Sequence, residues 1–331
     1  MERFALAAAV VLGFALTAAL CSLFVPLRRV LERREQNQQP AQSEQPRPAP
    51  LRAPLWGGLC AAAGTVAAVG VGWLAACVGQ PGLLGSEGRL MTRLLTALAG
   101  SLAFGAVGLA EDLARMRSPA ALGLRRDVRL LLEALAAAFV LLLLQAAGCL
   151  PRGLDVPGAG YVLLGSAVPF LWAVLMVALA ECARIAERDE GTVCGAAFVA
   201  MLALMMAEAG LGVPGLAVLP AALAGALVAL LLWAFPPARL GVGCCGSLLA
   251  AGAIGCIPLS LDMTSLTVPL ALPFWAAGGL WAAQLLGAKR TGKPLRCWVK
   301  KHKMSPETVF LCSFALSAVG YVLALALLRW C

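Results

Sequence analysis

The sequence predicts an all-α, polytopic membrane protein with about ten transmembrane helices. Of its 331 residues, 61% are hydrophobic and 13% are charged, about half the charged share of a soluble domain. The apolar runs are long and unbroken, whereas the strands of a membrane barrel alternate polar and apolar positions. The net charge of +9 therefore indicates loops facing an anionic lipid leaflet, and we expect no nucleic-acid partner.

Ten apolar segments, most of them about one bilayer thickness long, follow one another along the chain. They cover residues 4–26, 55–78, 91–110, 130–149, 160–180, 192–208, 214–234, 246–261, 266–287 and 308–328. We interpret the first as a retained helix and not as a cleaved signal peptide, whose apolar core would be shorter and would end in a small-residue cleavage site. No soluble stretch is long enough to fold separately, so residues 1–331 are expected to form a single integral membrane domain.

The loops between these segments differ strongly in charge. Of the 26 Lys and Arg residues, 21 lie in alternate loops on one side of the membrane and five on the other. The positive-inside rule predicts that the basic loops face the cytoplasm and that both termini lie on the outer side of the cell membrane. Residues 27–54, rich in Arg, Gln and Pro, are expected to form a flexible cytoplasmic linker. Residues 289–307 are expected to form a basic cytoplasmic loop that either anionic membrane lipids or a nucleotide diphosphate would attract.

Two of the loops on the basic side also carry acidic residues that suggest chemistry. Glu111 and Asp112 are adjacent at the end of an apolar run, Arg115 follows one helical turn later, and Arg129 opens the next run. Carboxylates bind hard cations through oxygen, and arginines bind phosphates. The simpler interpretation is a solvated loop that only obeys the positive-inside rule. A second charged loop, residues 181–191, lies on the same predicted side.

Five short motifs occur in the order found in one known family. They are residues 53–58 (APLWGG), 108–115 (GLAEDLAR), 123–129 (GL and a final Arg), 235–248 (FPPARLGVGCCGSL) and 291–293 (TGK). With ten predicted helices, the chain resembles the phospho-N-acetylmuramoyl-pentapeptide transferases, within the polyprenyl-phosphate sugar-1-phosphate transferases. The resemblance implies a ten-helix membrane enzyme with a cytoplasmic active site.

The resemblance also implies a reaction and a set of site residues. A sugar-1-phosphate would pass from a UDP-linked amino sugar, either UDP-MurNAc-pentapeptide or UDP-GlcNAc, to undecaprenyl phosphate in peptidoglycan or other envelope glycan synthesis. Mg²⁺ would neutralise the pyrophosphate. The implied catalytic residues are Glu111, Asp112 and Glu187, of which Asp112 and Glu187 would also hold the metal. The implied substrate-binding residues are Arg115, Arg129, Glu190, Lys293 and His302.

The sequence departs from the family pattern at several of these positions. Cys244 occupies the motif position of an Asp that, by the resemblance, is the family's metal ligand. A thiolate is a poor ligand for Mg²⁺. Two family Asn positions are Glu181 and Arg184, and the family's three-histidine loop keeps only His302. An alternative function is therefore a catalytically inactive paralogue that binds lipid or partner proteins as a membrane scaffold. A homodimer is compatible with either function, whereas a secondary transporter is disfavoured because the ionisable residues lie at helix ends.

Overall fold

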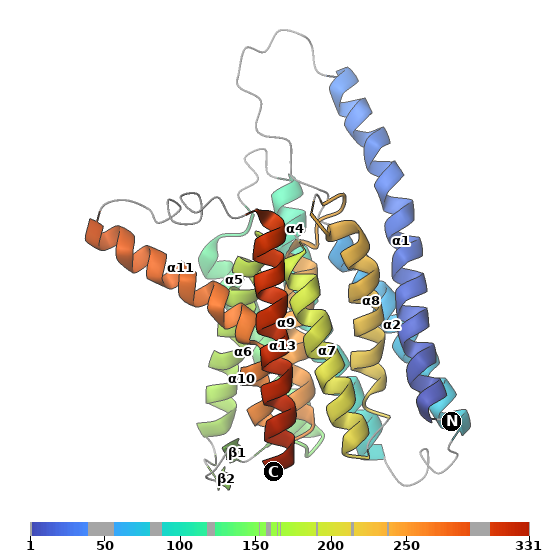
Figure 1. Ribbon diagram of the computed structural model, residues 1–331, viewed down its shortest axis with the longest axis vertical. Helices are drawn as coiled ribbons and strands as arrows, with labels where there is room; N and C mark the ends of the chain where they lie inside the picture. The colour runs from blue at the N-terminus through green and yellow to red at the C-terminus, as the bar shows by residue number, and fades with distance from the viewer. Residues whose placement is uncertain are drawn as a thin grey trace.

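The protein is an all-α, multi-pass helical bundle in which both termini lie at the same end (Figure 1). The computed structural model describes residues 2–38, 56–79, 88–117, 123–151, 153–156, 160–163, 165, 167–189, 191–212, 215–236, 238–291 and 305–330. The helices are α1 (Glu2–Gln38), α2 (Gly57–Gly79), α4 (Gly88–Arg117), α5 (Arg126–Ala146), α6 (Ala167–Ala186), α7 (Thr192–Gly210), α8 (Val218–Ala234), α9 (Gly243–Ser260), α10 (Thr267–Leu270), α11 (Leu272–Thr291) and α13 (Pro306–Trp330), with a 3-10 turn η1 (Thr264–Leu266).

The predicted fold class is confirmed. Within the described residues, seven helices are long and apolar enough to cross a membrane: α1, α2, α4, α6, α7, α9 and α13. The segment formed by η1 and α10 joins α11 at a bend of 61°, and the two together would make an eighth span. The remaining two predicted segments are also helical: α8 is apolar but has only 17 residues, and α5 begins with charged residues.

The fifth predicted segment begins later than expected. Residues 160–163 form a strand, β2 (Gly160–Leu163), which pairs antiparallel with β1 (Gly153–Val156) so that Gly153 opposes Leu163. The helix α6 starts only at Ala167. The apolar residues of β2 resemble the start of a span in composition, but their backbone groups bond to a neighbouring strand instead of to the next helical turn. Sequence hydropathy does not distinguish these two ways of satisfying the backbone.

The first helix extends beyond the predicted membrane segment. Helix α1 continues through Gln38, so the linker expected at residue 27 begins at least 12 residues later. The ring of Phe24 on α1 stacks against Trp56 just before α2, with centroids 5.6 Å apart and planes 8° from parallel. This contact packs α1 against the residue that precedes α2. The prediction that residues 39–54 are flexible stays untested, because these residues lie outside those that the structure describes.

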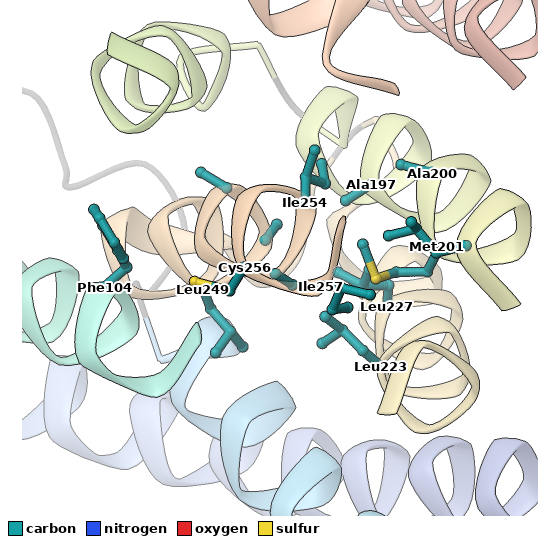
Figure 2. Packing of buried hydrophobic residues seen from close by; sticks show 14 of the residues in the cluster. Phe104, Ala197, Ala200, Met201, Leu223, Leu227, Leu249, Ile254, Cys256 and Ile257 are labelled. Atoms are coloured by element: carbon teal, nitrogen blue, oxygen red, sulfur yellow. The ribbon is translucent and has the colours of Figure 1, made fainter. Parts of the chain in front are cut away.

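Helix α9 is the centre of the bundle. All of its residues from Gly243 to Ser260 are buried, and it packs against α2, α4, α6 and α7. Figure 2 shows side chains of α4, α7 and α8 gathered around it, among them Phe104, Met201 and Leu227. Small residues allow the close approach: a Cβ at Gly252 of α9 would contact Phe104, and one at Gly100 of α4 would clash with Cys256. Small residues at helix contacts are typical of membrane bundles.

Candidate functional site

The charged ends of four helices meet at one end of the bundle. The β1–β2 hairpin connects the end of α5 to the start of α6, so the start of α5 and the end of α6 lie at the opposite end. Polar contacts join that end to the end of α4 and the start of α9. We call the following residues the polar cluster: Glu111, Asp112 and Arg115 of α4, Arg129 and Glu133 of α5, Glu181 and Arg184 of α6, Glu187 immediately after α6, and Cys244 and Cys245 of α9.

Asp112 holds the first turn of α9. Its Oδ1 accepts a hydrogen bond from the backbone N–H of Cys244 at 3.0 Å, and its Oδ2 accepts one from Cys245 at 2.9 Å. The first N–H groups of a helix have no partner within the helix, and negative charge is stabilised beside them. The preceding residue, Val242, supplies no side-chain cap. The buried Asp112 therefore caps α9 from a different helix and ties α4 to it.

Glu111 pairs with two arginines. Its Oε1 accepts a hydrogen bond from Nη2 of Arg115 at 2.7 Å, and Nη1 of Arg129 lies 3.5 Å from the same oxygen. Gly123, with a φ of +68°, brings the loop before α5 against the side chain of Arg115. The two cationic groups that the resemblance assigns to substrate phosphates thus already have a carboxylate partner.

Glu187 contacts the cysteine that replaces the family's metal-ligand Asp. The Sγ of Cys244 donates a hydrogen bond to Oε2 of Glu187 at 3.2 Å, and Nη1 of Arg115 lies 3.8 Å from that oxygen. Burial raises the pKa of Glu187 above its ordinary value, while the positive charge of Arg115 and the thiol hydrogen bond oppose this rise. These contacts bring together Asp112, Glu187 and Cys244, which the resemblance assigns to one metal site, whereas their catalytic and metal-binding roles stay predictions.

A second part of the cluster was not predicted. Glu181 accepts a hydrogen bond from Nε of Arg129 at 2.8 Å and another from Nη2 of Arg184 at 2.5 Å. Glu133 lies on the inner face of α5, fully buried, with its Oε1 3.9 Å from Nε of Arg129. Sequence reasoning identified positions 181 and 184 only as lost Asn residues. The available signal was their i,i+3 spacing with opposite charges, which is typical of a helical ion pair.

Three predicted substrate-binding residues cannot be placed in this cluster. Glu190, Lys293 and His302 lie outside the residues that the structure describes. Their proposed contacts with the substrate therefore remain predictions from the resemblance alone.

The described part of the cluster does not fit Mg²⁺. Over those residues, no group of three or more His, Cys, Asp or Glu side chains is arranged to hold a metal ion. The chemistry of the donors explains this: both oxygens of Asp112 accept helix N–H groups, Glu187 faces an arginine and a thiol, and Cys244 offers sulfur where Mg²⁺ requires oxygen. Mg²⁺ was implied by the resemblance, and the residues around Cys244 argue against it.

The glycine pair at the start of α2 positions the segment that leads into α9. The N–H of Gly57 donates to the carbonyl of Gly241 at 3.2 Å, and the N–H of Gly58 donates to Val242 at 2.8 Å. A Cβ on Gly58 would overlap the backbone of Gly246. The pair is therefore a close backbone contact that satisfies two N–H groups at the start of a helix.

Comparisons with known proteins identify the family of this chain. The family model described as glycosyl transferase family 4 matches residues 94–262. The phospho-N-acetylmuramoyl-pentapeptide-transferase of Desulforudis audaxviator is 32% identical over 170 residues, 48% of this chain and 50% of the relative. That of Synechococcus sp. is 30% identical over 212 residues, 63% and 55% of the two chains, and that of Mycobacterium tuberculosis is 27% identical over 235 residues, 63% and 64%.

The chain spans about half to two thirds of the length of these curated relatives. The family match itself extends from α4 to the end of α9 and covers more than half of this chain. It includes every residue of the polar cluster. This membrane protein therefore belongs to glycosyl transferase family 4.

Proposed function

We propose that this protein is a non-transferring member of its family, which binds a phosphate-bearing polyprenyl lipid such as undecaprenyl phosphate at the cytoplasmic face of the cell membrane. The observation that carries this proposal is the hydrogen bond from Cys244 to Glu187, at 3.2 Å. A thiol and a carboxylate that satisfy each other stand where the family's reaction requires a metal ligand. Phosphoryl transfer depends largely on positioning and on cations that neutralise developing charge, so the loss of this ligand removes a main contribution to catalysis.

Lipid binding is supported by the two faces of α5. One face carries Arg129 and Glu133, which are buried and belong to the polar cluster. The other exposes a row of apolar side chains, including Val128, Leu131 and Leu135. A polyprenyl chain lying along this row would bring its phosphate toward the arginines at the start of α5. The sequence assigns the 21 Lys and Arg residues counted above to one side of the membrane, and Arg115, Arg129 and Arg184 of the polar cluster are among them, so we assign this end of the bundle to the cytoplasm.

A second candidate is the transfer reaction itself. It would move a sugar-1-phosphate from UDP-MurNAc-pentapeptide or UDP-GlcNAc to undecaprenyl phosphate. The similarity to relatives named phospho-N-acetylmuramoyl-pentapeptide-transferase favours it, as does the gathering of Glu111, Asp112 and Glu187 in one cluster. In this case Glu187 would be the carboxylate to test, because Asp112 has a structural role that would confound its replacement.

The deciding experiment measures UMP release from each UDP-sugar in the presence of undecaprenyl phosphate, in detergent, with Mg²⁺ or with a chelator. We expect the purified protein to release no UMP under either condition. Mg²⁺-dependent release that Glu187→Gln abolishes would contradict the proposal and establish the second candidate. A binding measurement with undecaprenyl phosphate in the absence of nucleotide tests the lipid-binding half of the proposal separately.

The replacement Cys244→Asp should create a response to Mg²⁺. It places another carboxylate beside Glu187, so in chelator we expect a lower unfolding temperature than that of the unmodified protein, because two like charges then share a buried site. Added Mg²⁺ should restore the loss. Cys244→Ala removes the thiol without adding charge and is the control, since its unfolding temperature should not depend on Mg²⁺. If Cys244→Asp shows the same Mg²⁺ response as Cys244→Ala, the assignment of position 244 as the missing ligand is wrong.

A further inference from the structure

Both carboxylate oxygens of Glu181 are occupied by arginines from two helices. Oε1 accepts from Nε of Arg129 on α5, and Oε2 accepts from Nη2 of Arg184 on α6. The two guanidinium groups therefore share a single anion, each at a different oxygen. Two arginines around one anion are also the arrangement in which proteins bind phosphate, because guanidinium N–H groups match its oxygens. In the structure, the anion between them belongs to the protein.

Buried atoms around this carboxylate lack partners. The Nε of Arg184 is buried and donates no hydrogen bond, although Nη2 of the same guanidinium is paired with Glu181. A ligand with several acceptor oxygens would satisfy both of these donors, whereas one carboxylate oxygen satisfies one. Buried polar groups without partners are rare in folded proteins and call for an explanation such as a missing ligand.

Glu133 supplies a second, independent indication. It is fully buried, neither of its oxygens accepts a hydrogen bond, and its Oε1 lies 3.9 Å from Nε of Arg129. Glu133, together with Glu111, therefore remains beside Arg129 if Glu181 moves away. The side chain of Glu181 is 22% exposed, more than that of either arginine, so it lies on the open side of the pair, where an incoming anion would meet it.

We propose that Glu181 is a built-in competitor at a two-arginine phosphate site formed by Arg129 and Arg184. A phosphate group, whether free or carried by a lipid, binds there only by displacing the Glu181 carboxylate, and Arg129 then keeps Glu111 and Glu133 as partners within the protein. This inference deepens the proposed lipid-binding function and names the residue that controls access to it. It predicts weak phosphate binding in the unmodified protein and tighter binding once the competing charge is removed.

The test uses the full chain and two forms of phosphate in metal-free buffer. Radiolabelled inorganic phosphate is measured by equilibrium dialysis in detergent, and phosphatidic acid is measured by its retention in phosphatidylcholine nanodiscs. We expect Glu181→Gln to bind phosphate about tenfold (~1.4 kcal/mol) more tightly than the unmodified protein, because the incoming phosphate no longer has to displace a charged carboxylate from the two arginines. A gain in both forms indicates a site open to water, and a gain with the lipid alone indicates a lipid headgroup site.

Two controls separate the site from a general charge effect. Asp127→Asn removes the same charge from the exposed first turn of α5 and should leave the affinity unchanged. Adding Arg184→Gln to Glu181→Gln should abolish the gain. If Glu181→Gln does not fold, Glu181→Asp decides, because the shorter carboxylate should reach only one arginine and give an intermediate affinity. An unchanged affinity in the folded Glu181 variant, or an equal gain in Asp127→Asn, overturns the inference without bearing on UMP release.

Discussion

Replacing Asp112 with alanine is expected to destabilise the folded protein by about 3 kcal/mol or more, because two charge-assisted hydrogen bonds to the first turn of α9 are lost at once. The backbone N–H groups of Cys244 and Cys245 would remain buried without an acceptor. The protein is unfolded in detergent by heat or by increasing SDS, and tryptophan fluorescence monitors the unfolding transition.

The matched variant Asp112→Asn separates charge from hydrogen bonding. Its amide oxygen still accepts one N–H of α9, but its NH₂ group cannot accept the other, so we expect a loss smaller than that of Asp112→Ala. Asp127→Asn, at an exposed position, should unfold with the unmodified protein. If Asp112→Ala proves as stable as Asp127→Asn, Asp112 does not cap α9. The same result would restore Asp112 as a candidate for purely catalytic work.

Adding a single methyl group at Gly58 or Gly108 is expected to lower stability by about 1–3 kcal/mol, the usual range for overpacking. A Cβ at Gly108 would overlap the carbonyl group of Cys244, and one at Gly58 would overlap the backbone of Gly246. In both cases the obstacle is main chain, which cannot rotate aside as a flexible side chain would. We therefore expect Gly58→Ala and Gly108→Ala to separate α9 from α2 and from α4, respectively.

Gly70→Ala is the control for both variants. Gly70 lies in the same helix as Gly58, but nothing lies within 4 Å of a Cβ placed there. Alanine favours helix over glycine by up to ~1 kcal/mol, so this variant should be as stable as the unmodified protein or slightly more so. The unfolding transitions are compared in the same detergent. Equal stability of Gly58→Ala and Gly70→Ala would mean that the close contact between α2 and the start of α9 is absent.

Much of the architecture could be predicted from local sequence. All ten predicted apolar segments are helical over most of their length, because hydropathy over about 20 residues is enough to define a membrane helix. Where the prediction was wrong, the local signal was ambiguous. The composition of residues 160–163 is compatible with either a strand or a helix. The polar residues after position 26 do not show that α1 continues to Gln38.

The candidate site was predicted only in part. Glu111, Asp112, Glu187 and Cys244 could be grouped, because the motif order and the charged loops assigned them to one side. Their partners could not be read from the sequence. Asp112 looked like a metal ligand, yet its oxygens cap a helix that begins 131 residues later. The prediction for Glu190, Lys293 and His302 is untested, because they lie outside the described residues.

The sequence by itself determined that this chain is a helical membrane protein, which loops share a side, and which family it resembles. These properties follow from sums over local residues, namely hydropathy along each segment and charge in each loop. Only the tertiary structure decided which polar groups pair. Glu181 accepts hydrogen bonds from both Arg129 and Arg184, and Cys244 donates one to Glu187. Such pairings depend on how close helices bring groups that lie far apart in the chain, and Coulomb and hydrogen-bond energies depend on that distance.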